Sequence, residues 1–169
     1  MDNQRTKCNR NLRFIVDRMH GDLARWLRIL GYDTYYSPSL TDYRIIQIAS
    51  RTGRIIVSRD RGLVAWARRK GLKAFLITGV EPEEKLAELA RHTRMCLDFD
   101  PGLSRCPMCN NKLVKVDKDK VAGKVPPRVL EEHSEFWYCT KCGKVYWMGS
   151  HWRDILDRLE KAKKMISNY

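Results

Sequence analysis

Short apolar runs and helically spaced apolar residues alternate along the first half of the chain. Runs rich in β-branched and aromatic residues cover positions 12–16, 33–36, 54–57 and 73–78, and their length is typical of strands. The segment after the first run carries Leu23, Leu27 and Leu30 at helical spacing. We expect this helix to end at Gly31, because glycine readily adopts the left-handed conformation that ends helices.

Three more helices follow the later runs. Thr41 and Asp42 open a helix that stops near Gly53, and an apolar set around 63–67 predicts a helix that closes at Gly71. Pro82 suits the first turn of a helix that extends to about residue 92. Repeated strand–helix units with short links predict an α/β unit, with helices covering a parallel sheet of about four strands. The carboxyl ends of all its strands then share one edge, where open α/β sheets carry their sites.

Four cysteines in the second half form two C-x-x-C pairs, Cys106/Cys109 and Cys139/Cys142. Two such turns supply four thiolates, which is the ligand set of a structural zinc ion, and Gly143 suits the turn of the second pair. The polar stretch 116–127 between the pairs is interpreted as an inserted loop that Pro126 and Pro127 stiffen. Cys8 and Cys96 stand alone; we expect no disulfide framework, and we interpret Cys96 as a reduced, buried thiol.

A last amphipathic helix is expected over about residues 152–164, with lysines near its end. The predicted organisation is therefore a flexible basic segment (1–11), an α/β domain (12–100), a zinc ribbon (101–150) and a C-terminal basic helix (151–169). Residues 1–13 lack the apolar stretch of a signal peptide, and no apolar run reaches the length of about 20 residues that crosses a bilayer. We therefore expect a cytoplasmic protein that does not enter the membrane.

Basic residues outnumber acidic ones along the whole chain, which has 33 Lys and Arg, 20 Asp and Glu, and a net charge of +13. The excess is present in the α/β part, the cysteine-rich part and the tail, so it does not come from a basic tail on a neutral domain. A solvated basic surface is one explanation. A polyanionic partner, RNA or the ribosome above all, fits better because such self-repulsion needs compensation.

Three aspartates fall at the predicted carboxyl edge of the sheet. Asp17 ends the first strand, Asp60 follows the third, and Asp42 begins the helix after the second. Converging carboxylates suit Mg²⁺ or Mn²⁺, and such an ion suits phosphodiester cleavage. Each aspartate also stands where a helix begins, so helix capping is the competing interpretation. Nearby arginines are candidate phosphate contacts: Arg18, Arg25, Arg28, Arg59 and Arg61.

Aromatic residues gather around the second cysteine pair, including Trp137, Tyr138, Tyr146, Trp147 and Trp152. They supplement the core of a small zinc module in one interpretation, and stack on unpaired bases in the other. We take Trp147, His151 and Trp152 as candidate RNA contacts. His151 is expected to be a structural or phosphate-contacting group, since four sulfurs already complete a zinc site.

The chain resembles the Mut-seven C-terminal RNase family, in which a PIN-like ribonuclease domain precedes a zinc ribbon. The matching motifs begin with Val16-Asp17-Arg18-Met19, Leu23-Ala24-Arg25-Trp26-Leu27-Arg28, Leu30-Gly31-Tyr32-Asp33-Thr34 and Val57-Ser58-Arg59-Asp60-Arg61. They continue with Ser104-Arg105-Cys106, Val125-Pro126-Pro127-Arg128-Val129, Phe136-Trp137, Val145-Tyr146-Trp147 and Gly149-Ser150-His151-Trp152. The resemblance spans about residues 12–155.

This resemblance implies a metal-dependent ribonuclease with Asp17, Asp42 and Asp60 as acidic ligands and Ser58 as their hydrogen-bonding support. PIN nucleases often carry a further acidic residue two positions after the strand-end aspartate, where this chain has Gly62. His20 and Asp22 also depart from the expected apolar and basic residues.

Three functions follow from the sequence. The first is a metal-dependent endoribonuclease with an RNA-binding zinc ribbon. The second is a non-catalytic protein of the same fold that binds RNA, with ribosomal RNA or the ribosome as candidate partners. The third is a zinc-ribbon protein that binds DNA or acts in transcription.

Overall fold

The computed structural model describes residues 7–168 and contains a four-stranded parallel sheet in the order β2-β1-β3-β4. Its strands are β1 (Arg13–Val16), β2 (Asp33–Tyr35), β3 (Ile55–Ser58) and β4 (Ala74–Leu76). The helices between them are α1 (Gly21–Ile29), α2 (Asp42–Thr52) and α3 (Arg61–Arg69), with α4 (Pro82–Thr93) after β4 and a 3₁₀ turn, η1 (Arg18–His20), before α1. The predicted α/β fold with a parallel sheet of four strands is confirmed.

Alternate residues of the strands build two separate cores, which makes the unit three-layered. Phe14 and Val16 of β1 point into a core shared with α1 and α4, while Ile15 and Ile56 point into a core shared with α2 and α3. Period-two alternation thus sends neighbouring side chains to opposite faces of the sheet, and both faces are covered.

Local chemistry sets the helix ends close to their predicted positions. The Thr41 hydroxyl accepts the Arg44 N–H at 3.3 Å at the start of α2, and Gly53 ends that helix at φ 69°. At α4, Glu81 and Glu84 form a reciprocal capping box just before and after Pro82.

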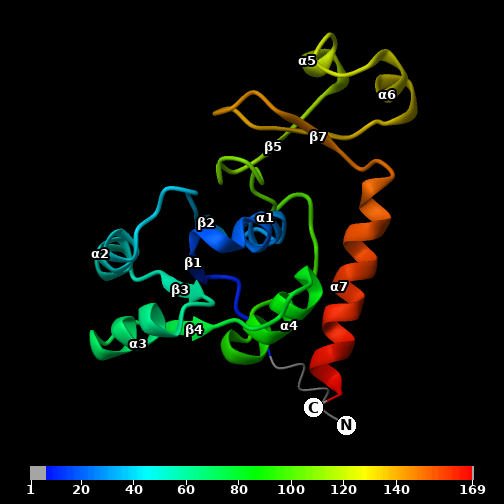
Figure 1. Cartoon of the computed structure of the whole chain (residues 1–169). Coiled ribbons are helices and arrows are strands. Elements are labelled where there is room, and N and C mark those ends of the chain that lie inside the picture. Colours follow the sequence, from blue (N-terminus) through cyan, green and yellow to red (C-terminus); the bar gives the residue numbers. More distant parts are fainter. Residues whose placement is uncertain (1–6, 169) are drawn as a thin grey trace.

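The cysteine-rich module is a three-stranded antiparallel sheet in the order β5-β6-β7, at one end of the molecule (Figure 1). Its strands are β5 (Val114–Val116), β6 (Phe136–Tyr138) and β7 (Val145–Trp147). The prediction of a plain loop over 116–127 is wrong, because α5 (Lys118–Val121) forms there and α6 (Pro127–Glu132) follows. Val121 and Val125 pack on Phe136 as a small core, and this apolar contact organises the insertion.

The last helix, α7 (His151–Ser167), runs from the ribbon back along the α/β unit beside α4 (Figure 1). Leu159 and Ala162 are buried in the core that β1, α1 and α4 share. Arg158 adds an ion pair with Glu83 of α4 at 2.6 Å. The segment 151–169 predicted as a separate terminal helix therefore packs, through its described residues, as part of the α/β unit. No helix in the described part of the chain combines the length and apolar character needed to cross a bilayer.

Replacing Leu159 by alanine should destabilise the α/β unit. Leu159 is 2% exposed, so its truncation leaves a cavity in the main core, and we expect a loss of about 3 kcal/mol in the free energy of unfolding. Leu156→Ala is the matched control, since Leu156 on the same helix is 41% exposed. Urea denaturation of the two variants measures the difference, and equal stabilities would mean that α7 is not part of this core.

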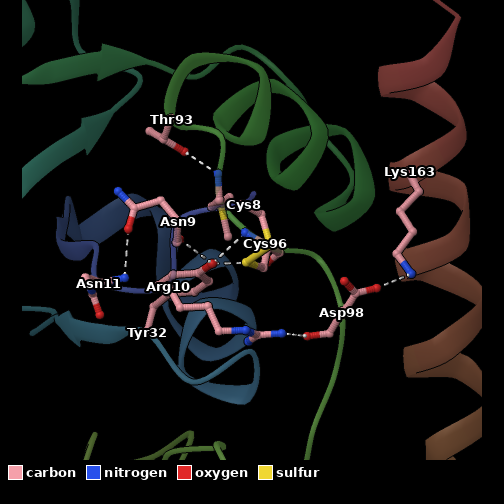
Figure 2. The surroundings of a disulfide bond; sticks show 10 residues. Cys8, Asn9, Arg10, Asn11, Tyr32, Thr93, Cys96, Asp98 and Lys163 are labelled. Carbon is pink, nitrogen blue, oxygen red and sulfur yellow. Dashed lines mark hydrogen bonds and ion pairs between the residues drawn. A yellow bond between two sulfur atoms is a disulfide. The ribbon is translucent and has the colours of Figure 1, made fainter. Parts of the chain in front are cut away.

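A disulfide joins Cys8 to Cys96, which corrects the interpretation of Cys96 as a reduced thiol (Figure 2). The backbone around it pairs as well, since Asn9 bridges to Met95. The Tyr32 hydroxyl accepts the Cys96 N–H at 2.7 Å and lies 3.1 Å from the Asn9 carbonyl oxygen. Asp98 then connects this corner to α7 through Lys163 at 2.9 Å. The first described segment of the chain is therefore held against residues 94–96, which follow α4.

Replacing Cys8 by serine should lower stability, because the bond closes a loop across a sequence separation of 88 residues. Loop entropy for this separation gives an upper value of about 4.6 kcal/mol, and disulfides typically contribute less, so we expect a loss of about 2–4 kcal/mol. The same loss should appear when the wild-type protein is reduced, while Cys8→Ser should be insensitive to reductant. Urea denaturation with and without reductant measures both, and a wild type unaffected by reductant would contradict the prediction.

Candidate functional site

The parallel sheet is extended in opposite directions from its two central strands, β1 and β3. The sheet grows from β1 to β2 on one side and continues from β3 to β4 on the other, so the crevice beyond the carboxyl ends of β1 and β3 is the topological switch point. Asp17 follows β1 directly, and its N–H donates to the Val57 carbonyl of β3 at 3.0 Å. Asp60 follows β3 by two residues. Two of the predicted aspartates therefore stand where such sheets bind ligands.

Ser58 links these two aspartates. Its hydroxyl donates to Asp17 Oδ2 at 2.7 Å and accepts the backbone N–H of Asp60 at 2.9 Å. Ser58 is fully buried and Asp17 is 4% exposed. This hydrogen bond fixes the orientation of the Asp17 carboxylate beside Asp60. The geometry matches the supporting position that the sequence resemblance implied for Ser58.

The capping interpretation applies to one aspartate of the three. Asp60 Oδ1 accepts the Leu63 N–H at 3.0 Å and so caps α3. Asp17 precedes η1 without a side-chain capping bond, and Thr41 takes the capping position next to Asp42. Gly62 faces the site, because a Cβ there would lie 3.1 Å from Asp60 Oδ1. Glycine thus leaves the Asp60 carboxylate uncrowded and brings no further charge.

Asp42 lies in the exposed first turn of α2, where the charges of the other two carboxylates act on it. Partial burial raises the pKa of Asp42, and the charges of Asp17 and Asp60 raise it further. Within residues 7–168, however, the four cysteines are the one group of three or more candidate ligands spaced to hold a single ion. The charges of the three aspartates therefore influence one another, but their carboxylate oxygens do not form such a closely spaced group.

None of the three carboxylates forms an ion pair with another described residue. This absence stands out in a chain of net charge +13. Three acidic groups that repel one another at one edge raise the electrostatic energy there, and a bound cation would lower it. The edge is therefore suited to hold a positive ligand.

Arg28 does not belong to the rim of phosphate-binding arginines that the sequence predicted. It is 5% exposed, and its guanidinium donates to the Thr34 carbonyl at 3.0 and 3.1 Å and to the Pro107 carbonyl at 2.9 Å. These bonds connect α1 to β2 and to the first cysteine turn. Arg28 is thus a structural link, and its position on the buried side of α1 is the physical reason.

The other four predicted arginines are exposed: Arg18, Arg25, Arg59 and Arg61. Arg59 donates to the Thr78 and Gly79 carbonyls at 3.1 and 2.9 Å, which places it beside the loop after β4. The positive charge of Arg18 partly opposes the rise in the Asp42 pKa. Their contact with RNA remains a prediction.

His20 and Asp22, the two departures from the family pattern, lie next to this edge. Asp22 pairs with Lys85 of α4 at 2.6 Å. Burial opposes ionisation of Asp22, but the hydrogen bonds from Lys85 and from the Leu23 N–H, together with the charge of Lys85, outweigh it and lower the Asp22 pKa. His20 is 2% exposed, and neither ring nitrogen has a partner among the described residues. Burial and the Lys85 charge lower the His20 pKa, so the ring favours its neutral form.

The four cysteine sulfurs all lie within 4.8 Å of one another. The Cys106–Cys142 and Cys109–Cys139 sulfur pairs are 3.6 and 3.4 Å apart. Tetrahedral zinc with bonds of 2.3 Å separates its sulfurs by about 3.8 Å, so the donor set fits zinc. Gly143 and Asn110, which follow the two pairs, adopt φ values of 74° and 69° and close the turns. The prediction for Gly143 is confirmed, and the same role of Asn110 was missed.

Tyr146 completes the surroundings of the cysteines. Its hydroxyl lies 3.1 Å from the Cys106 sulfur. Burial raises the Tyr146 pKa, and the hydroxyl therefore stays protonated and can donate to the sulfur. Such an outer hydrogen bond orients a metal ligand and tunes its charge.

Asn110 also fastens the first cysteine turn to the parallel sheet. Its side-chain oxygen accepts the Thr34 N–H of β2 at 2.9 Å, and its amide donates to Asp33 at 2.8 Å. Asp33 in turn pairs with Arg54 at 2.8 Å. The ribbon is therefore anchored to the edge strand β2, which fixes its position relative to the aspartates.

The three predicted aromatic and histidine contacts lie together: Trp147, His151 and Trp152 all line one apolar cavity between the ribbon and α7. The structure thus separates the candidate residues into two places, the aspartate edge and the ribbon cavity.

Comparison with known proteins rests on one match. No curated protein matches the chain, and no solved structure matches it. The family described as Mut7-C RNAse domain matches residues 12–159, which include the aspartate edge, the cysteine cluster and the first part of α7. This match covers most of the chain and indicates a ribonuclease-type function, with RNA as substrate or partner. With its four-stranded parallel sheet and its four-cysteine cluster, the chain belongs to the Mut7-C RNase domain family.

Proposed function

We propose that the protein is a metal-dependent endoribonuclease that hydrolyses RNA phosphodiesters at the edge formed by Asp17, Asp42 and Asp60. The observation that carries this proposal is the position of these carboxylates at the switch point, where none of them has an ion pair among the described residues. Unpaired carboxylates would repel the phosphates of RNA, so the substrate can approach productively only when a cation is present.

The donor set suits Mg²⁺ or Mn²⁺, because these ions prefer carboxylate oxygen. Asp17, Asp60 and Asp42 would hold the ion once their carboxylates draw together around it, and the bound ion would supply a more acidic water and neutralise charge on the phosphate oxygens. Ser58 holds the Asp17 carboxylate in a fixed orientation through its hydrogen bond of 2.7 Å. The exposed Arg18 and Arg61 flank the edge and attract the RNA backbone.

The zinc ribbon would contribute RNA affinity in this proposal, because it is rigidly anchored to β2 and carries a net positive charge. We keep ribosomal RNA among the candidate substrates, and the cytoplasmic location expected from the sequence stays a prediction.

A second candidate function is RNA binding without catalysis. Two observations favour it: Gly62 takes the position of a further acidic residue, and the three aspartates are not spaced to hold one ion. In this case the three aspartates would have no catalytic role, and the basic surface would supply the affinity for RNA.

A nuclease assay separates the two functions. Purified full-length protein is incubated with single-stranded RNA, structured RNA, ribosomal RNA and DNA, without added metal and then with Mg²⁺ or Mn²⁺. The proposal expects internal cuts in RNA only when one of these ions is added. RNA binding without cleavage in either ion would support the second function, and a preference for DNA would contradict both.

A further inference from the structure

An apolar cavity of about 130 Å³ lies where the zinc ribbon meets the start of α7. Five of its fourteen lining residues are aromatic: Phe99 in the segment before the ribbon, Trp137 in β6, Tyr146 and Trp147 in β7, and Trp152 in α7. Ile29 at the end of α1 also lines it, so both the α/β unit and the ribbon contribute. The cavity is not part of the aspartate edge.

The aromatic rings of the wall are held in position. Trp152 packs edge-to-face on Phe99, with ring centroids 4.0 Å apart. A Cβ at Gly149 would lie 3.1 Å from Trp147 Nε1, so the glycine leaves room for the indole beside the turn. A site whose flat walls are already in place loses little side-chain entropy when a flat ligand enters.

Polar groups at the cavity are free to bind. Among residues 7–168, the imidazole of His151 and the indole N–H groups of Trp147 and Trp152 have no hydrogen-bond partner. The combination of flat apolar walls and a few hydrogen-bonding groups is typical of sites that take heteroaromatic rings.

A basic cavity of about 390 Å³ adjoins the aromatic one through Arg105, which lines both. Arg10, Arg13 and Lys112 also line the basic cavity. Its one acidic side chain, Asp33, is neutralised by Arg54. An apolar slot beside a cluster of four basic side chains complements a ligand that joins an aromatic ring to negative charge.

We propose that the aromatic cavity takes one unstacked base of single-stranded RNA, while the adjoining basic cavity holds the phosphates next to that base. The size agrees, because an apolar cavity of about 150 Å³ accepts a benzene ring. Aromatic walls bind any base face, so the site favours single strands over a particular sequence. The inference rests on the proposed function only for the choice of RNA as the ligand.

The proposed base site lies away from the aspartate edge. Arg13 begins β1 and Asp17 follows its end, so about 13 Å of strand separates the basic cavity from the acidic edge. An RNA chain bound at both places would be held at the ribbon and cleaved at the aspartate edge, several nucleotides away.

Tryptophan fluorescence tests the proposal directly, since three tryptophans line the cavity. The wild-type protein, with its zinc and without added Mg²⁺ or Mn²⁺, is titrated with oligouridylate of about eight nucleotides. An abasic oligomer with the same number of phosphates is the control for charge. The proposal expects tighter binding and stronger quenching with the oligouridylate; equal binding and quenching by the two oligomers would overturn it.

Variants then locate the contact. Trp147→Leu should weaken oligouridylate binding about 5- to 150-fold, the range of one lost base stack, and leave abasic binding unchanged. Trp147→Phe should restore most of the affinity, because it restores an aromatic face. Trp66→Leu makes the same change on α3, outside the cavity, and should bind as the wild type does. Zinc content and melting temperature show whether each variant is folded.

The outcomes for this site and for the nuclease are distinguishable. Base-dependent binding that needs Trp147, in a protein that never cleaves RNA, would support the cavity and overturn the nuclease. If the protein cleaves RNA and Trp147→Leu leaves oligouridylate affinity unchanged, the nuclease proposal is supported and the cavity proposal is overturned. If wild-type chains self-associate and Trp147→Leu makes them monomeric, a second copy covers the cavity and the proposal is wrong.

Discussion

Asp17→Asn is expected to abolish RNA cleavage while RNA affinity stays equal or rises slightly. Asparagine keeps the shape of the side chain and can still accept the Ser58 hydroxyl, but it removes a negative charge from the switch point. Removal of an outer hydrogen-bonding partner of a metal already costs about 10- to 100-fold, so loss of a direct ligand should lower the cleavage rate by more than about 100-fold. Affinity should not fall, because lysines and arginines supply the contacts to phosphate.

The control is Asp154→Asn, which removes the same charge from an exposed position on α7. Cleavage rates under single-turnover conditions and a salt titration of RNA affinity are measured for all three proteins. If Asp17→Asn cleaves as the wild type does, the aspartate edge is not the catalytic site. If it loses affinity as well as cleavage, a metal bridge to phosphate dominates binding, and the division between the aspartate edge and the basic surface is wrong.

Cys139→Ser should remove the zinc and unfold the ribbon, while the α/β unit stays folded. Cys139 is fully buried, and its sulfur lies 3.4 Å from that of Cys109. A small metal module draws much of its folding energy from the metal, and the ribbon core holds only three buried hydrophobic residues. The α/β unit has two larger cores of its own, and α7 packs on one of them.

Metal analysis should give one zinc per wild-type chain and none for Cys139→Ser. Hydrogen exchange should show lost protection in β5, β6 and β7 and retained protection in β1 and β3. Thr140→Ser, a neighbouring and milder change, should keep the zinc. Unchanged zinc stoichiometry in Cys139→Ser would contradict the four-cysteine site, and collapse of the parallel sheet would contradict independent stability of the α/β unit.

Features that depend on nearby residues could be predicted from the sequence. The strands and helices of the α/β unit follow from apolar periodicity and from end signals such as Thr41, Gly53 and Pro82. The cysteine cluster follows from two short C-x-x-C turns. The aspartates could be placed at one edge because parallel strands end together, whichever order the sheet takes.

The candidate site was predicted in part, for the same reason. Ser58 and Asp60 are two residues apart, so their contact is encoded locally, and the resemblance to the family supplied the role of Ser58. The separation of the aspartates depends on side-chain positions across three chain segments, and no local signal sets it. His20 gave no sign of burial in the sequence, because its burial comes from the packing of η1 against distant elements.

The sequence by itself determined the elements of the α/β unit, the four cysteine ligands and the edge that carries the acidic residues, since each depends on residues close together in the chain or on a general rule of sheet topology. Only the tertiary structure decided which distant segments meet. It turned Arg28 inward to the carbonyls of Thr34 and Pro107, joined Cys8 to Cys96, and laid α7 on α4. It also formed the aromatic cavity from α1, the 99–107 segment, the ribbon and α7. Such contacts depend on how complete helices and strands pack against one another, and the spacing of residues along the chain does not predict them.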